Sequence, residues 1–213
     1  MALQNKLGLT DELELAREEE RISKTKASVM FESGFLDTLE AGTVSTLCEI
    51  HRFLFCDIYD FAGKLRTVNI SKGKFRFASV MYLEDALAAV EKMPQSSFDE
   101  IIEKYVEMNI AHPFREGNGR SMRIWLDLML KASLGKVTDW NSVDKESYLA
   151  AMEHSPVSDR DIKAVIASAL TDRISDRDTF MKGIDNSYYY EGYTAYSTAR
   201  LSELHNKINR ECP

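Results

Sequence analysis

Twelve residues in the middle of the chain, His112 to Arg123 (HPFREGNGRSMR), combine the side chains that chemistry on phosphates requires. The pKa of a histidine lies near neutrality, so His112 can take a proton from a hydroxyl group. A carboxylate such as Glu116 can hold Mg²⁺ together with phosphate oxygens. Arg120 and Arg123 are three residues apart, which places them on roughly one helix face, where each guanidinium group can bind a phosphate.

The glycines of this run stand where one helix gives way to the next. Pro113 ends the first helix, because the residue before a proline is pushed out of helical geometry. Backbone amides at a helix N-terminus lack partners inside the helix, and Gly117 and Gly119 let an anion approach them closely. Taken singly, these residues could be helix caps, connections or surface charges. Together they favour nucleotide phosphates clamped for in-line attack by a protein hydroxyl.

Helical periodicity dominates the rest of the sequence, so the fold class is expected to be all-α. A charged, amphipathic helix is expected over 11–33, and a central helix, apolar on much of its circumference, over about 98–110. The other expected helices start at Thr43 or span about 83–93, 118–133, 145–153, 159–170 and 176–192. The exception is 68–78, where two-residue alternation around Lys72-Gly73 predicts one short β-hairpin. We expect a single domain over 1–213.

Composition narrows the class of protein. The chain has 213 residues, enough for one sizeable core, with 44% hydrophobic and 29% charged residues. A net charge of −7 disfavours direct binding to nucleic acid. No apolar stretch is long enough for a membrane span, and the N-terminus shows no secretory signal. The three cysteines form no paired framework, which is typical of a reduced, cytoplasmic protein.

The twelve-residue run matches, without a departure, the HPFx[D/E]GNGRxxR signature of the Fic domain family, and the chain resembles that family. The resemblance implies a Fic-type helical core over about 43–170, with the hairpin as its flap. Fic proteins are mostly adenylyltransferases, which move AMP from ATP to a Ser, Thr or Tyr hydroxyl of a target protein and release pyrophosphate. ATP would therefore be the substrate, Mg²⁺ the cofactor and a hydroxyl-bearing protein the partner, held by strand-like pairing with the flap.

The resemblance also implies a role for each signature residue. His112 would deprotonate the target hydroxyl, and Glu116 would bind Mg²⁺. The phosphates would be held by the rest of the signature, the α- and β-phosphates by Gly117, Asn118 and Gly119 and the outer ones by Arg120 and Arg123. Two weaker candidates for nucleotide contact are Lys72 and Asn109.

A second unusual stretch lies near the C-terminus, where Ser187 and Glu191 are four residues apart and share a helix face. It resembles the family's inhibitory motif [S/T]xxxE[G/N], placed as in the third, self-inhibited class. By that likeness Glu191 would pair with Arg123 and turn the α-phosphate of ATP away from in-line attack. A plainer alternative is a tyrosine-rich docking helix with an incidental glutamate. The neighbouring tyrosines are candidates for self-modification.

Other functions stay open at this point. The same site could remove AMP, with Glu191 positioning a water molecule. From a different class, the chain could be a catalytically silent helical adaptor that presents its hairpin, although the complete set of signature residues disfavours this. A homo-oligomeric interface could control release of the C-terminal helix.

Overall fold

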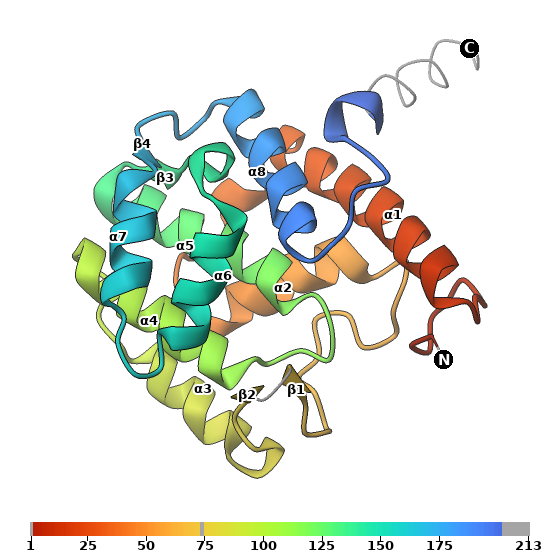
Figure 1. The fold of residues 1–213 in the computed structure, drawn as a ribbon, viewed down its shortest axis with the longest axis horizontal. Helices are drawn as coiled ribbons and strands as arrows, with labels where there is room; N and C mark the ends of the chain where they lie inside the picture. The colour runs from red at the N-terminus through yellow and green to blue at the C-terminus, as the bar shows by residue number, and fades with distance from the viewer. Residues whose placement is uncertain (1, 73–74, 202–213) are drawn as a thin grey trace.

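The computed structural model describes residues 2–72 and 75–201, except for the side chains at 72 and 75. It is built almost entirely from helices, as Figure 1 shows, which confirms the predicted all-α class. The helices are α1 (Glu12–Glu32), α2 (Val44–Phe55), α3 (Leu83–Glu91), α4 (Phe98–Ala111), α5 (Asn118–Leu134), α6 (Lys145–His154), α7 (Arg160–Ser168) and α8 (Arg177–Tyr190). Short 3-10 turns are η1 (Phe35–Thr38), η2 (Val80–Tyr82) and η3 (Trp140–Ser142).

Polar caps explain where several helices begin. The side chain of Asp11 accepts a hydrogen bond from the amide of Glu14, and that of Thr43 accepts one from the amide of Thr46. Ser97 forms a reciprocal capping box with Glu100 at the start of α4. Such caps satisfy amides that have no partner within the helix, and each typically stabilises by about 1 kcal/mol.

Strands are short and come in two antiparallel pairs within the described residues. β1 (Ser71–Lys72) pairs with β2 (Phe75–Arg76), where the sequence predicts the hairpin. β3 (Val137–Thr138) pairs with β4 (Leu170–Thr171), a pair that the periodicity does not predict. The expected helix over 159–170 is therefore too long at its end: α7 stops at Ser168, and Leu170 pairs with Thr138 instead.

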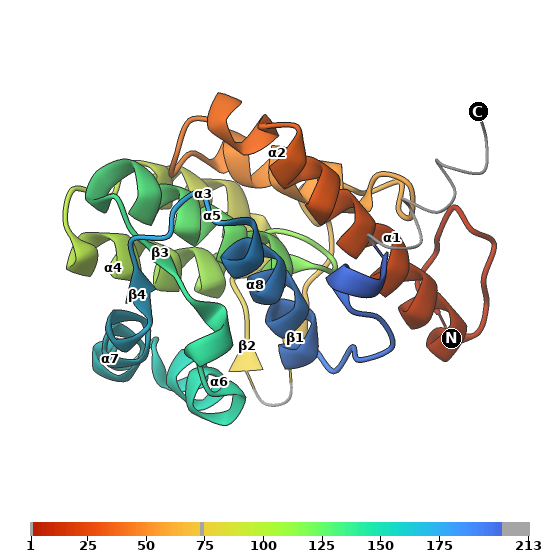
Figure 2. The same ribbon diagram turned by 90° about the horizontal axis from the view of Figure 1, so that it is seen from above.

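The core is centred on α4 and α5, which pack against each other (Figures 1 and 2). Around α5 lie α2 and α8, and α1 packs against both of these. The inward side chains of α5, including Trp125, Leu126 and Met129, are fully buried. Because α5 begins with the signature residues, this packing holds the N-terminus of α5 rigidly within the molecule.

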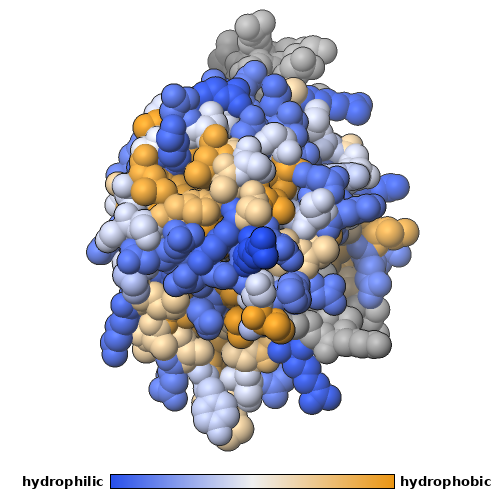
Figure 3. All heavy atoms as spheres, turned by 60° about the vertical axis from the view of Figure 1, so that its left-hand side comes forward, coloured by the Kyte–Doolittle hydropathy of each residue, from blue (hydrophilic) through white to orange (hydrophobic). Residues whose placement is uncertain are grey.

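On the side that carries α7, apolar side chains form separate groups divided by hydrophilic residues (Figure 3). Among the described residues no helix is both long and apolar enough to cross a lipid bilayer.

Candidate active site

His112 ends α4 in an unusual backbone conformation. Its φ is 48° and its ψ 66°, and it is the one non-glycine with positive φ in the described part of the chain. A side chain in this left-handed region is strained, so surrounding bonds must hold it. Arg66, which is buried, supplies them: Nε donates to the carbonyl of His112 at 2.8 Å and Nη2 to that of Ala111 at 3.1 Å. The same guanidinium binds the carbonyl of Val68 at 2.8 Å, so it joins the turn after α4 to the base of the flap.

The ring of His112 is fixed as well. Nδ1 lies 3.2 Å from the carbonyl oxygen of Asn109, one turn earlier in α4. A carbonyl only accepts, so Nδ1 carries the proton and Nε2 is the basic nitrogen. The ring stacks on Phe77 of the flap, with centroids 3.6 Å apart. These contacts give the imidazole one orientation and one tautomer, as a general base requires.

The turn between α4 and α5 is braced from inside by two polar side chains. Asn118, which is buried, accepts from the amide of Phe114 at 2.8 Å and donates to its carbonyl at 2.7 Å. His51 lies beneath the turn: its Nδ1 accepts from the amide of Gly63 and its Nε2 reaches the carbonyl of Glu116, each at 2.8 Å. Burial lowers the pKa of His51 to about 4, so the ring is neutral at physiological pH. Neither this role of His51 nor that of Arg66 is predicted by any pattern in the sequence.

Both glycines of the turn meet close neighbours. Gly117 has φ of +77°, and a Cβ there would lie 2.6 Å from a ring carbon of Phe55. At Gly119 a Cβ would lie 2.5 Å from the carboxylate of Glu191. The carboxylate of Glu191, at the end of α8, therefore lies beside Gly119 in the first turn of α5. It stands near the start of α5, where the sequence predicts that phosphate oxygens bind.

The two signature arginines are both buried, but they have different partners. Arg120 lies 2.8 Å from Glu116 and also pairs with Glu19 of α1. Burial disfavours a charge, yet these carboxylates raise the pKa of Arg120 well above its ordinary value. The sequence predicted that Arg120 binds outer phosphates, and this stays a prediction.

Arg123 faces α8. Its Nε donates to the hydroxyl of Ser187 at 2.7 Å, and its Nη2 donates to the carbonyl of Ser187 at 2.8 Å. The same Nη2 lies 3.2 Å from the carboxylate of Glu191. Tyr148 and Tyr190 flank the guanidinium with their rings, at 5.7 and 5.3 Å from its central carbon. The structure thus brings Ser187 and Glu191 onto Arg123 from a distance of more than 60 residues along the chain.

A cleft of about 760 Å³ connects these groups, which is a suitable size for a nucleotide. Its walls come from the flap, the end of α4, the start of α5, α6 and the end of α8. Of the predicted site residues, those that line it are Asn109, His112, Glu116, Gly117, Asn118, Gly119, Arg120, Arg123 and Glu191. Ser187 lies behind Arg123, and the side chain of Lys72 lies outside the described part.

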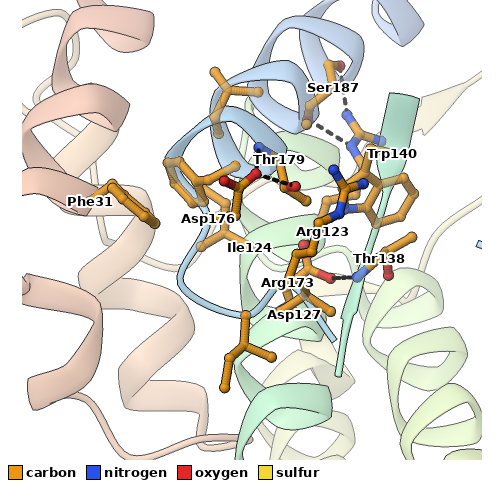
Figure 4. Close-up of a pocket in the computed structure, with 15 residues that line it drawn as sticks. Phe31, Arg123, Ile124, Asp127, Thr138, Trp140, Arg173, Asp176, Thr179 and Ser187 are labelled. Carbon is orange, nitrogen blue, oxygen red and sulfur yellow. Dashed lines mark hydrogen bonds between the residues drawn. The ribbon is translucent and has the colours of Figure 1, made fainter. Parts of the chain in front are cut away.

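A second, much smaller cavity of about 50 Å³ lies behind Arg123 (Figure 4). Asp127 lines it and accepts from the amide of Thr138 at 2.8 Å and from the indole of Trp140 at 2.9 Å. Burial raises the pKa of Asp127 to about 6. A cavity of this size holds water molecules and not a nucleotide, so the large cleft is the candidate site.

Glu116 is the residue that fits Mg²⁺. Its side chain is 41% exposed, lines the cleft and accepts from the amide of Gly117 at 2.9 Å. Over the described residues no three His, Cys, Asp or Glu side chains form a metal-binding group. A single carboxylate suits Mg²⁺, because this ion is commonly bound by one or two carboxylates plus phosphates of the substrate.

Part of the chain matches a known protein family, and several known proteins are similar to it. Residues 41–130 match the Fic/DOC family. "Probable protein adenylyltransferase Fic" of Salmonella typhimurium is 27% identical over 186 residues, covering 80% of this chain and 88% of that protein. "Protein adenylyltransferase VbhT" of Bartonella schoenbuchensis is 30% identical over 182 residues, covering 79% of this chain but only 37% of its own length.

Solved structures share the fold. The N-terminal Fic domain of a Bep effector from Bartonella sp. AR 15-3 superposes with a TM-score of 0.68 at 18% identity, covering 80% of this chain and 88% of that one. The BepC protein of Bartonella tribocorum, solved with bound AMPPNP, gives 0.64 at 18% identity, with 80% and 93% covered.

Proposed function

This chain carries a Fic domain, and on that premise we propose that it is a Mg²⁺-dependent protein adenylyltransferase, held inactive by its own α8. Relatives named as protein adenylyltransferases support the reaction class. The observation that carries the proposal is the convergence of a fixed imidazole, an amide nest, a carboxylate and a guanidinium on one cleft across the α4–α5 turn. A silent adaptor would have no need of a base held in one tautomer.

In the proposed reaction the hydroxyl oxygen of a target side chain attacks the α-phosphorus of ATP, and the bond to the leaving pyrophosphate breaks. Nε2 of His112 takes the hydroxyl proton. The amides of Gly117 and Gly119 hold the α- and β-phosphates at the positive end of α5, and Arg123 binds the outer phosphate once it is free. Mg²⁺, when bound at Glu116, neutralises charge on the phosphates.

The target protein is proposed to lie along the flap. Ile70 and Ser71 line the same cleft as His112, and Phe77 touches the imidazole. An extended segment paired with β1 would therefore present its hydroxyl beside the base. Such pairing reads backbone geometry more than side chains, so one flap can serve several targets.

Self-inhibition is proposed from the place of Glu191. Its carboxylate contacts Arg123 and stands beside Gly119. It therefore occupies the guanidinium that an outer phosphate needs and also lies close to where the phosphate oxygens would bind. ATP that enters with Glu191 in place must leave its outer phosphate without Arg123. Its α-phosphate is then misplaced, and small displacements strongly slow in-line transfer.

The test uses ATP labelled at the α-phosphate, cell lysate and the Glu191→Gly variant. We expect label on protein, and loss of about 10²- to 10⁴-fold in initial rate when His112→Ala is added. His154→Ala is the matched control, since His154 is 54% exposed at the end of α6, away from the cleft. Equal incorporation with and without His112 would remove it from its proposed role. No incorporation at all, with ATP binding retained in calorimetry, would refute the adenylyltransferase proposal.

A further inference from the structure

A carboxylate from the N-terminal helix reaches the signature arginine. Glu19 of α1 is 2% exposed, although it lies in a run of charged residues on the helix. It pairs with Arg120 and accepts hydrogen bonds from the hydroxyls of Tyr59 and, at 2.9 Å, of Tyr193. Glu19 stands outside the residues 41–130 that match the Fic/DOC family. A buried, ionised carboxylate with this many donors is held in one position.

Arg120 in turn is enclosed on all sides that the structure describes. Its central carbon lies 4.9 Å from the ring of Phe55, 5.2 Å from that of Tyr188 and 4.9 Å from that of Tyr193. The side chain is 1% exposed, and its two terminal nitrogens bind Glu19 and Glu116. To swing out to a phosphate it would have to leave two carboxylates and three rings, which is costly for a buried ion pair.

Glu116 lies on the cleft side of Arg120. Arg120 touches the same Oε1 of Glu116 that accepts from the amide of Gly117. Of the three charged groups Glu19, Arg120 and Glu116, only Glu116 is substantially exposed, at 41%. The charges alternate from α1 to the cleft, and the last group is the one that fits Mg²⁺.

We propose that Glu19 and Arg120 are positioning residues that act through Glu116 on the divalent cation, which makes α1 part of the metal site. This inference rests on the proposed role of Glu116. Arg120 orients the carboxylate and competes with the metal for it. Glu19 offsets the positive charge of Arg120, so that Glu116 keeps enough negative charge to bind a divalent ion.

Glu19→Gln should affect the binding of a divalent cation and the binding of metal-free ATP differently. Replacing Glu19 by the isosteric glutamine leaves Arg120 with one carboxylate instead of two and makes the site more positive by one charge. Glu116 then pairs more tightly with Arg120 and binds a divalent cation more weakly. Metal-free ATP, an anion, is not repelled by the added positive charge and binds as well as before. A variant that is merely damaged would lose affinity for both.

The experiment measures both affinities in the Glu191→Gly background. Mn²⁺ replaces Mg²⁺, and free Mn²⁺ is followed by electron paramagnetic resonance in the presence of ATP, while binding of metal-free ATP is measured by calorimetry with a chelator. For Glu19→Gln we expect Mn²⁺ affinity to fall about 10-fold, as is typical when a group behind a metal ligand is changed, with unchanged ATP affinity. Glu18→Gln is the control, because it removes the same charge from a half-buried side chain one residue earlier, which pairs with Arg21 and not with Arg120.

Three outcomes decide the matter. Unchanged Mn²⁺ affinity in Glu19→Gln, with a loss in Glu116→Gln, overturns the inference and leaves the proposed function intact. No loss in Glu116→Gln overturns the metal role of Glu116 itself. Equal loss of Mn²⁺ and metal-free ATP shows a structural role only and also overturns the inference. Should Glu19→Gln not fold, Tyr193→Phe removes one hydrogen bond to Glu19 and must weaken Mn²⁺ binding in the same direction, by less.

Discussion

Glu191→Gly is the perturbation that addresses the proposed inhibition most directly. The carboxylate lies 3.2 Å from Nη2 of Arg123 and stands beside the first turn of α5. Removing it opens the guanidinium on the side that Glu191 occupies, next to Gly119, while the two bonds between Arg123 and Ser187 still hold α8. The variant is therefore expected to keep its fold and to bind the triphosphate with its outer phosphate on Arg123.

The size of the effect follows from the contact that is lost. A hydrogen bond to a charged partner contributes about 1.5–3 kcal/mol when it is shielded from water. Glu191 is 22% exposed and Arg123 3%, so the pair is largely shielded and about 2 kcal/mol is a fair value. Since about 1.4 kcal/mol corresponds to tenfold in an equilibrium, the competent population should rise about 30-fold, and the initial rate of AMP transfer with it.

The assay is the initial rate of transfer from α-labelled ATP at saturating nucleotide, compared between variants of equal thermal stability. Asp178→Asn is the matched control, because it removes a carboxylate from the exposed first turn of the same helix. Glu191→Gln, which keeps the volume but not the charge, should fall between the wild type and Glu191→Gly. A folded Glu191→Gly protein that binds ATP but transfers AMP no faster than the wild type would refute inhibition by this carboxylate.

Two further predictions follow from burial. Self-modification should fall on Tyr189, which is 48% exposed while its neighbours Tyr188 and Tyr190 are buried, so mass spectrometry after ATP incubation of Glu191→Gly should find AMP there and not in the Tyr189→Phe double variant. The pKa of His51 is lowered by burial to about 4 from 6.5, so His51 contributes about 3 kcal/mol to stability above pH 6.5, lost as the pH falls through about 4. An imidazole titration followed by NMR with a midpoint near 6.5 would contradict this.

Local patterns were enough to predict the fold class and the place of the turn. The helix cap at Thr43, the stop at Pro113 and the glycines at the start of α5 act within a few residues of where they stand. Such signals are read correctly from sequence because the physics behind them is local. The strand pair of β3 and β4 joins segments more than 30 residues apart, so no periodicity within a window could indicate it.

The site also combines local contacts, which the sequence predicts, with long-range contacts, which it does not. The spacing from His112 to Arg123 predicts that these residues meet, since they lie on either side of one turn. It does not reveal Glu19, which meets Arg120 from 101 residues away. The sequence around Glu19 is that of a charged, solvated helix face, yet Glu19, Glu20 and Lys24 are all buried against α8 and the segment after it. Only the assembled fold decides which charges of such a helix are removed from water.

Asn118 braces the turn between α4 and α5 through its side chain. The resemblance assigns it to the phosphates, but both polar atoms of its side chain bind the backbone of Phe114, four residues earlier. An asparagine in this position closes the turn upon itself and so aims the following amides. The contribution of Asn118 to phosphate binding can therefore come through the shape of the turn.

The end of α8 contacts both signature arginines, Arg123 and Arg120. One of these contacts can be lost while the other is kept. Through Glu191 it occupies Arg123, but through the ring of Tyr188 it helps to enclose Arg120, and Tyr193 just beyond it bonds to Glu19. If Arg120 positions Glu116, then a seated α8 supports the proposed metal site at the same time as it carries out the proposed inhibition. Activation by displacing the whole helix would free Arg123 at the expense of the enclosure around Arg120. Withdrawal of Glu191 alone would free Arg123 and keep that enclosure, so the geometry favours a small movement at the end of α8 over its release.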